Sequence, residues 1–251
     1  MNAAMKRTTD GEISGISSMA TKHVLADLAD AYRLRSGQRV AIESVGGVDA
    51  ARRIEAGEPF DFVVLADHAI EALAAAGRVD PASRIDLARS GVAVAVKRDG
   101  RRPDIGNAAA VRDAVLAARS VGYSTGPSGK HLAQLFQRWG IAEAIAPRLV
   151  QAPPGVPVAE LVALGDAELG FQQLSELIGD ARIEVLGPLP PEIQALTVFS
   201  AAVCCASTRA EEASALLSFL ASTEAEAAKR RHGMEPADGR ARPRRPPWGD
   251  A

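Results

Sequence analysis

The sequence predicts an α/β fold with mainly parallel sheets flanked by helices. Short apolar runs alternate along the chain with longer segments whose apolar residues recur at helical spacing, which is typical of successive βαβ units. Glycines follow several of these helical segments and stop them. With 251 residues, the chain is long enough for one large domain or two small ones.

Three strand–helix pairs are expected in the first part of the chain. Residues 13–16 form a weak first strand, and the apolar residues from Val24 to Tyr32 follow helical spacing. Gly37 ends this helix, because glycine suits a left-handed cap. The other elements expected here are strands over 38–43 and 60–65 and helices over 49–56 and 69–76.

A second group of elements begins with a strand over residues 91–96. The loop 97–104 that follows is expected to cross into a second lobe. The elements expected in this lobe are helices over 111–118, 131–139 and 158–164 and strands over 120–123, 169–173 and 183–186. A strand over 197–206 then returns to the first lobe, and one long helix over 211–231 closes it.

The expected lobes follow from this order of elements. The first lobe consists of residues 1–91 and 199–235, and the second lobe consists of residues 92–198. Residues 236–251 are rich in Pro, Gly and Arg and have little to bury, so we expect a disordered tail.

Composition excludes several classes of partner. A formal net charge of -2 provides no basic field for a phosphate backbone, and 4% aromatic residues do not make a stacking platform for single strands. The Arg-rich segment 240–245 is too short to change this conclusion. We therefore expect no nucleic-acid partner.

Motifs for metals and cofactors are absent from the sequence. The four histidines are scattered, and neither cysteine has a zinc-type spacing. Cys204 and Cys205 are neighbours in an apolar run and are expected to be two small buried side chains without a disulfide. No P-loop or Gly-x-Gly-x-x-Gly pattern occurs, so we expect no metal and no cofactor.

No targeting segment is visible in the sequence. Residues 1–18 are polar and contain glycine, whereas a secretory signal needs an apolar stretch of about 7–15 residues. No apolar run reaches the roughly 18–20 residues of a membrane span, so no direct membrane insertion is expected. As written, the chain is expected to be cytoplasmic, and a mis-assigned start site would make it periplasmic.

Three turns that join a strand to a helix carry small or hydroxyl residues. A helix N-terminus has free N–H groups and a partial positive charge, so such turns are prepared anion sites. The alternative for each turn is structural, with the serines as helix caps and the glycines as tight turns. The candidate ligand-binding residues of these turns are Ser17, Ser18, Met19, Gly46, Gly47, Ser124, Thr125, Gly126, Ser128 and Gly129.

Several segments resemble a known protein family. They are the residues from Gly15 to Met19, from Ala51 to Gly57, from Asp61 to Asp67, from Leu164 to Phe171, and from Phe199 to Gly233. Over residues 13 to about 235, the chain is similar to the molybdate-type periplasmic solute-binding proteins of ABC importers. The resemblance implies a two-lobed, periplasmic-binding-protein-like (type II) fold with its ligand between the lobes. It also implies a monomer that binds molybdate or tungstate for an ABC importer.

The resemblance assigns ligand roles to particular residues. It makes Ser18 the first serine ligand and puts Ala66 at the end of the third strand, near the cleft. The chain has Gly46 and Gly47 where the family offers serines, and Gln173, beside Gln172, where the family has a tyrosine. Because amides both donate and accept, these changes favour a carboxylate over a tetrahedral dianion. Lys130 and His131 could supply positive charge.

A branch of the same fold is similar to bacterial aconitate isomerases, which move a proton on a tricarboxylate. Such chemistry needs a base, for which His131 and Glu43 are candidates. Three functions therefore stay open. They are the binding of a small anion (molybdate, tungstate or a di- or tricarboxylate), aconitate-isomerase-like catalysis, and a cytosolic anion-responsive regulator.

Overall fold

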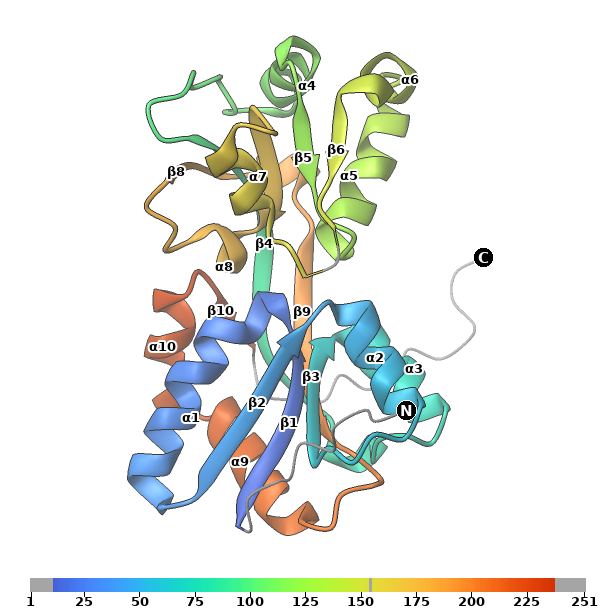
Figure 1. Ribbon diagram of the computed structural model, residues 1–251, viewed down its shortest axis with the longest axis vertical. Coiled ribbons are helices and arrows are strands. Elements are labelled where there is room, and N and C mark those ends of the chain that lie inside the picture. Colours follow the sequence, from blue (N-terminus) through green and yellow to red (C-terminus); the bar gives the residue numbers. More distant parts are fainter. Residues whose placement is uncertain (1–10, 154, 238–251) are drawn as a thin grey trace, which may run out of the picture.

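The computed structural model describes residues 11–153 and 155–237. Two α/β lobes follow one another along the long axis of the molecule (Figure 1). Each lobe contains parallel strands with helices on both faces. The α/β fold class predicted from the sequence is therefore confirmed.

Ten strands form one continuous network. Its order is β2-β1-β3-β9-β4-β7-β5-β6, with β8 and β10 both paired to β4. The strands are β1 (Glu12–Ser18), β2 (Arg39–Val45), β3 (Phe62–Ala66), β4 (Ile85–Lys97), β5 (Val121–Tyr123), β6 (Leu149–Gln151), β7 (Leu169–Gln173), β8 (Ile183–Pro188), β9 (Leu196–Val203) and β10 (Glu235–Pro236).

The sheet is mixed, whereas the sequence predicts a mainly parallel one. Strands β2, β1 and β3 are parallel to one another, as are β6, β5 and β7. Between these two groups lie β9 and β4, which run antiparallel to their neighbours. The alternation of short apolar runs with helical segments does not show where the chain reverses direction between lobes.

Strand β4 passes from one lobe to the other. Residues from Ile85 to Gly91 pair with β9, and those from Val92 to Lys97 pair with β7 and β8. The crossing expected in loop 97–104 is therefore wrong, since the chain crosses inside a 13-residue strand. The exact lobe limits proposed from the sequence stay a prediction.

Helices cover the two sheet halves. They are α1 (Lys22–Ser36), α2 (Gly47–Glu55), α3 (Asp67–Ala75), α4 (Ala108–Ala117), α5 (Pro127–Arg138), α6 (Ala142–Ile145), α7 (Val158–Leu164), α8 (Leu174–Leu177), α9 (Ala210–Ala221) and α10 (Glu226–Arg231). Gly37 ends α1 in the left-handed conformation, with a φ of 75°, as predicted. Among the described residues, no helix is both long and apolar enough to cross a bilayer.

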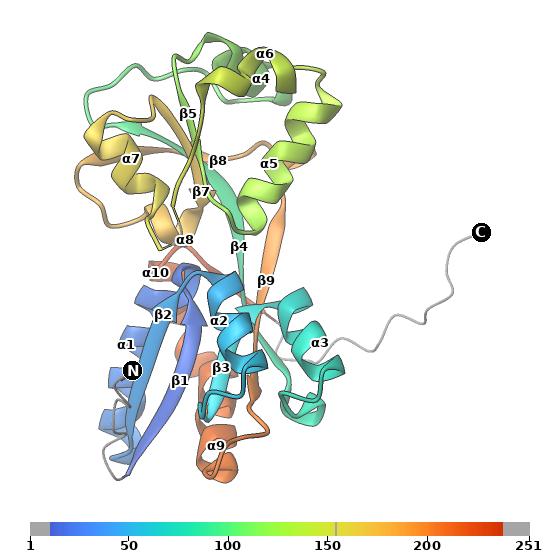
Figure 2. The ribbon, with the colours of Figure 1, turned by 45° about the vertical axis from the view of Figure 1, so that its right-hand side comes forward.

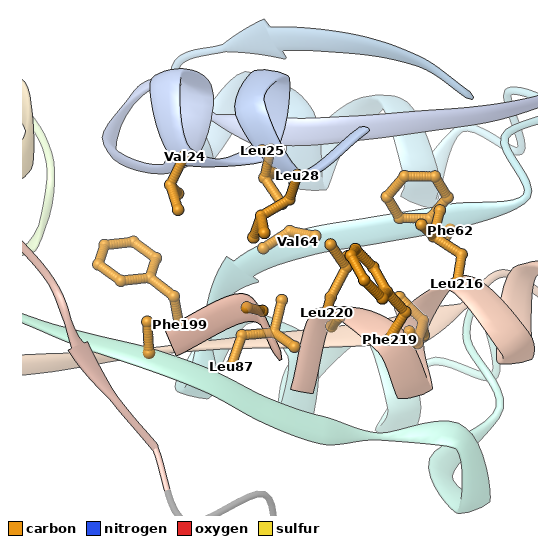
Figure 3. Close-up of a cluster of buried hydrophobic side chains, with 14 of the residues drawn as sticks. Val24, Leu25, Leu28, Phe62, Val64, Leu87, Phe199, Leu216, Phe219 and Leu220 are labelled. Carbon is orange, nitrogen blue, oxygen red and sulfur yellow. The ribbon is translucent and has the colours of Figure 1, made fainter. Parts of the chain in front are cut away.

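The core of the first lobe shows why its elements are amphipathic. On one face, α1 and α9 pack Leu25, Leu28 and Leu216 against apolar side chains of β3 and β9 (Figure 3). On the other face, α2 and α3 cover a second cluster that includes Ile54 and Leu73. Both faces of β3 are thus buried, which explains its uninterrupted apolar run.

The closing segment differs from its prediction. The sequence predicts one helix over 211–231, but Ser222 has an extended ψ of 165° and separates α9 from α10. The Ser222 hydroxyl donates to the carbonyl of Phe219 at 2.7 Å, so it satisfies a helix-end acceptor. Hydrophobic periodicity could not predict this break, because the helical spacing of apolar residues continues across it.

The start of the expected tail is ordered. Met234 is 2% exposed in the first-lobe core, and β10 pairs Pro236 with Ala88. The prediction of a disordered tail from residue 236 is therefore wrong for Pro236 and Ala237, since Ala237 N–H donates to the carbonyl of Leu87. The rest of that prediction, residues 238–251, and the expected absence of a leader in residues 1–10 lie outside the described residues.

A buried carboxylate connects three segments of the first lobe. One oxygen of Asp61 accepts hydrogen bonds from the Ser14 N–H at 2.8 Å and the Ser14 hydroxyl at 3.0 Å. The other oxygen accepts from the Ser207 hydroxyl at 2.7 Å. Asp61 is only 7% exposed, so these donors take the place of water. The carboxylate therefore joins β1, the start of β3 and the turn after β9.

We expect Asp61→Ala to lower the free energy of unfolding by about 2–4 kcal/mol, because it leaves the buried Ser14 N–H without an acceptor. Urea denaturation followed by circular dichroism measures this change. The control is Asp30→Ala, which removes an exposed carboxylate 3.7 Å from Arg33 and is expected to change stability by less than about 0.5 kcal/mol. Equal effects of the two variants would contradict the prediction.

Candidate functional site

A cavity of about 670 Å³ lies between the two lobes. Its wall comes from the carboxyl ends of strands in both lobes and from the helices that follow them. The N-terminal ends of α2 and α5 face this region from opposite lobes (Figure 2). The predicted site residues that line it are Ser18, Met19, Gly46, Gly47, Ala66, Ser124, Thr125, Gly126, Ser128, Gln172 and Gln173.

Three helix N-termini at the cavity begin on small residues. Gly46, Ala66 and Gly126 are the N-caps of α2, α3 and α5, and none of these three residues makes a side-chain cap hydrogen bond of its own. At α3, Asp67 accepts the His68 N–H at 2.8 Å. At α5, the Gly126 N–H donates to the Ser124 hydroxyl at 3.3 Å, and Pro127 has no N–H. No such side-chain bond is recorded at the start of α2 among the described residues, so α2 offers the freer N–H groups to an anion.

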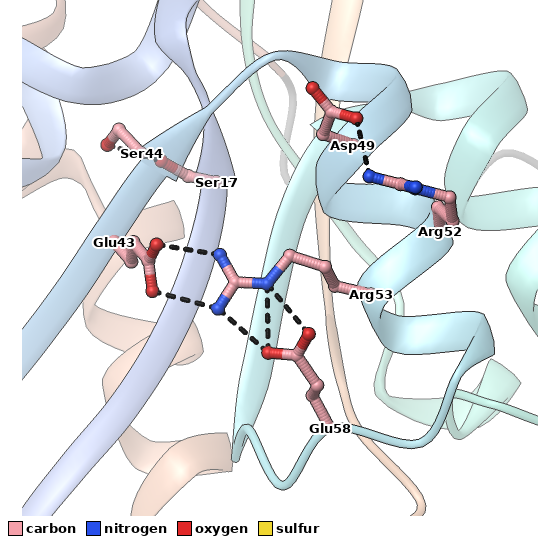
Figure 4. Close-up of polar contacts among 7 residues, drawn as sticks. All are labelled: Ser17, Glu43, Ser44, Asp49, Arg52, Arg53 and Glu58. Carbon is pink, nitrogen blue, oxygen red and sulfur yellow. Dashed lines mark hydrogen bonds and ion pairs between the residues drawn. The ribbon is translucent and has the colours of Figure 1, made fainter. Parts of the chain in front are cut away.

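The two serines at the end of β1 differ in their surroundings. The Ser18 hydroxyl oxygen is buried at the cavity wall and has no hydrogen-bond partner among the described residues. Ser17 does not line the cavity, and its hydroxyl lies 2.9 Å from the hydroxyl of Ser44 on β2 (Figure 4). Successive side chains of a strand point to opposite faces, so only one of the pair can reach the cavity. Both serines belong to β1 rather than to the predicted turn.

The turn after β5 is held by its own hydroxyls. Ser124 and Ser128 lie 3.0 Å apart through their hydroxyl oxygens. Helix α5 begins at Pro127, four residues before its predicted start, because proline suits the first helical position. Gly129 lies in the first turn of α5 and not on the cavity wall. A Cβ there would meet the Ser124 carbonyl oxygen at 1.7 Å, so this glycine allows the close turn.

Both glutamines line the cavity, but their amides have protein partners. The Gln172 amide oxygen accepts from the Val158 N–H at 2.8 Å, and its nitrogen donates to Glu176 at 2.7 Å. The Gln173 amide is taken in the orientation in which its oxygen and its nitrogen both have hydrogen-bond partners. Its oxygen then accepts from the Thr197 hydroxyl at 2.7 Å. Its nitrogen then donates to the Ser90 carbonyl at 2.9 Å. A direct ligand role for these amides stays a prediction.

The two bases suggested by the sequence do not line the cavity. The His131 ring nitrogen Nε2 lies 2.7 Å from the carbonyl oxygen of Ile193. Glu43 makes two bonds to the guanidinium of Arg53, which also binds Glu58 (Figure 4). These carboxylates raise the pKa of Arg53 above its usual range. The geometry thus gives neither His131 nor Glu43 access to a ligand in this cavity.

Charged side chains that the sequence analysis did not single out also line the cavity. Arg52 lies 3.0 Å from Asp49, and His68 and Glu176 stand on the wall from opposite lobes. Burial raises the pKa of Glu176 to about 7, against the opposing effect of its hydrogen bond with Gln172. The spacing of Gln172 and Glu176, four residues apart just after a buried strand, is a signal in the sequence that could have revealed this pair.

The described residues contain no group of three or more His, Cys, Asp or Glu side chains arranged to hold a metal ion. Cys204 is buried, as expected, and burial raises the pKa of its thiol to about 12. The expectation that Cys205 is buried is wrong, because this side chain is exposed. The strand expected over 197–206 ends at Val203, and Cys205 lies in the turn that follows, where the chain leaves the core.

The chain is similar to solved binding proteins of the same fold. The molybdate-binding protein of Azotobacter vinelandii superposes with a TM-score of 0.75 at 21% identity, covering 89% of this chain and 98% of that one. The sulfate-binding protein of Mycobacterium tuberculosis superposes with a TM-score of 0.72 at 17% identity, covering 90% and 87%. These likenesses confirm the two-lobed binding-protein fold.

A curated relative and a family model complete the comparison. An aconitate isomerase from Pseudomonas sp is 35% identical over 227 residues, covering 88% of this chain and 86% of that protein. The model described as bacterial extracellular solute-binding protein matches residues 13–235. Both resemblances expected from the sequence are thereby confirmed. The chain belongs to the bacterial extracellular solute-binding proteins.

Proposed function

We propose that the cavity binds a tricarboxylate and moves a C=C bond within it, as an aconitate isomerase does. One observation carries this proposal. The N-termini of α2 and α5 come from opposite lobes and open on one cavity, and neither N-cap residue, Gly46 or Gly126, has a side chain that could cap its helix. A ligand with carboxylates at both ends satisfies both N-termini at once and bridges the lobes.

The size and lining of the cavity support an organic ligand. About 670 Å³ is within the range of roughly 300–1,000 Å³ typical of small-molecule sites, and it exceeds what one tetrahedral oxyanion fills. Apolar side chains such as Leu65 and Phe199 line part of the wall. They suit the carbon skeleton of a tricarboxylate, while the N–H groups and hydroxyls suit its charged ends.

The same arrangement suits the reaction. Removal of an allylic proton spreads negative charge from the carbon skeleton into an adjacent carboxylate. Fixed N–H groups and the Ser18 hydroxyl can stabilise that charge without reorganising, because the fold already holds them in place. The relative named as an aconitate isomerase, 35% identical over most of both chains, supports this function.

The second candidate function is binding without turnover, for delivery to an ABC importer. The family description and the structural similarity to a molybdate-binding protein favour it. The hydroxyls of Ser18, Ser124 and Ser128 are donors that a molybdate or tungstate ion could use. The two functions differ in whether a bound carboxylate is converted.

We expect cis- and trans-aconitate to stabilise the purified protein in a thermal-shift assay that also contains citrate, succinate, molybdate, tungstate and sulfate. A ligand at about 100 times its dissociation constant adds roughly 2.7 kcal/mol to the free energy of unfolding. We expect the same protein to interconvert the two aconitates, as followed by proton NMR. A shift with molybdate or tungstate alone would reject the tricarboxylate and favour the second candidate.

We expect Ser18→Ala to weaken aconitate binding by about 10- to 100-fold, since it removes a hydroxyl available to a charged ligand. Isothermal titration calorimetry measures this loss. Unfolding stability is expected to change by less than about 0.5 kcal/mol, because the hydroxyl has no protein partner to lose.

The matched control is Ser17→Ala. This change removes the contact with Ser44 and is expected to lower stability by about 1 kcal/mol while leaving aconitate affinity unchanged. Equal affinity of the Ser18→Ala variant and the wild type would show that the ligand does not use the end of β1.

A further inference from the structure

Glu176 occupies a distinctive place at the cavity. It lies in α8, the short helix that directly follows β7, and its side chain is partly buried in the cavity wall. Helix α8 sits at the edge of the second lobe nearest the first (Figure 1), where it lies against the turn Met19–Thr21 after Ser18. The carboxyl group therefore belongs to one lobe and adjoins the ligand-facing end of β1 in the other.

The fold fixes the orientation of this carboxyl group. The Gln172 amide nitrogen donates to Oε1 of Glu176 at 2.7 Å, and the amide oxygen accepts from the Val158 N–H at 2.8 Å. The start of α7 thus fixes the amide, and the amide fixes one carboxyl oxygen. No described residue donates to Oε2, which is free to meet a substrate proton.

The protonation of Glu176 suits a base at neutral pH. Burial raises its pKa to about 7, while the Gln172 amide, which favours the charged form, acts against this rise. A base is most effective when its pKa lies near the working pH, because it is then both ionised and basic enough to remove a proton. The charged or titratable side chains on the same cavity wall are Asp49, Arg52, Glu55, His68 and Lys130.

The other candidate bases on the wall are less suited. Asp49 is paired with Arg52 at 3.0 Å, and His68 and Glu55 are exposed to water. Lys130 is exposed too. On the elements packed against α8, Glu160 pairs with Arg182, and Glu184 pairs with Arg102, so both are committed elsewhere.

We infer that Glu176 is the catalytic base of the proposed isomerisation and that Gln172 is its positioning residue, an inference that rests on the proposed function. The Glu176 carboxylate takes a proton from the substrate methylene carbon, and the C–H electron pair forms the new C=C bond with the central carbon. The electrons of the old C=C bond take a proton from the Glu176 carboxyl group at the former vinyl carbon. No atom or electron is gained or lost.

The test is Glu176→Gln, which keeps the size of the side chain and removes the base. We expect aconitate interconversion and the exchange of its methylene protons with D2O to fall by at least about 100-fold, both followed by proton NMR. Aconitate is expected still to stabilise the variant in the thermal-shift assay. The control is Glu211→Gln on the exposed side of α9, which is expected to keep wild-type activity.

The pH profile tests the positioning role separately. Because the carboxylate is the active form, kcat of the wild type is expected to rise with pH through about 7. Gln172→Ala removes the hydrogen bond that favours the charged form, so the rise is expected to shift to higher pH. A merely structural role of Gln172 would lower activity equally at every pH.

The outcomes of these experiments separate the role of Glu176 from the proposed function. Equal turnover by Glu176→Gln and the wild type would leave the proposed function standing and overturn the role of Glu176. A wild type that neither interconverts the aconitates nor exchanges their protons would overturn the proposed function, and the base role with it. Should Glu176→Gln fail to fold, the shift in the Gln172→Ala profile decides, and its absence would overturn the inference.

Discussion

The continuity of β4 is the constraint on which the rest of the structure depends. One strand pairs first with β9 in the first lobe and then with β7 and β8 in the second, so neither sheet can be placed without the other. Side-chain amides reinforce the crossing point, where Gln194 binds both the N–H and the carbonyl of Val92. Because the parallel strands of both lobes end beside this crossing, their carboxyl ends meet at one cavity.

The proposed anion site depends little on charged side chains. Backbone N–H groups at helix ends cannot be titrated or moved without unfolding the helix, so they suit an anion that must be bound and released. A ligand that contacts both lobes favours the closed arrangement by the difference in its affinity for the two states. Such closure also removes water and strengthens the interactions of the bound charge.

A site that binds the ligand and a site that isomerises it would differ by few residues in this cavity. A binding protein needs only the N–H groups and the hydroxyls of the cavity wall, whereas an isomerase also needs one titratable group beside the substrate. Glu176 is the group proposed for this role. Helix α8, which carries it, follows directly on a strand whose end lines the cavity, and burial raises the pKa of Glu176 to about 7 against the opposing effect of its hydrogen bond with Gln172. A single carboxyl group would thus add a reaction to a site built for binding.

The sequence by itself determined the α/β class, most strands and helices, the family resemblance and most of the small residues that line the cavity. These features depend on local periodicity and on the positions of small residues, both of which can be read directly from the order of amino acids. Tertiary structure alone decided that β4 crosses the lobes, that Ser222 interrupts the closing helix and that Ser18 rather than Ser17 faces the cavity. It also decided that Glu176 lines the cavity, whereas His131 and Glu43 do not. Burial, hydrogen-bond partners and access to a cavity depend on segments far apart in the chain, and no local pattern records them.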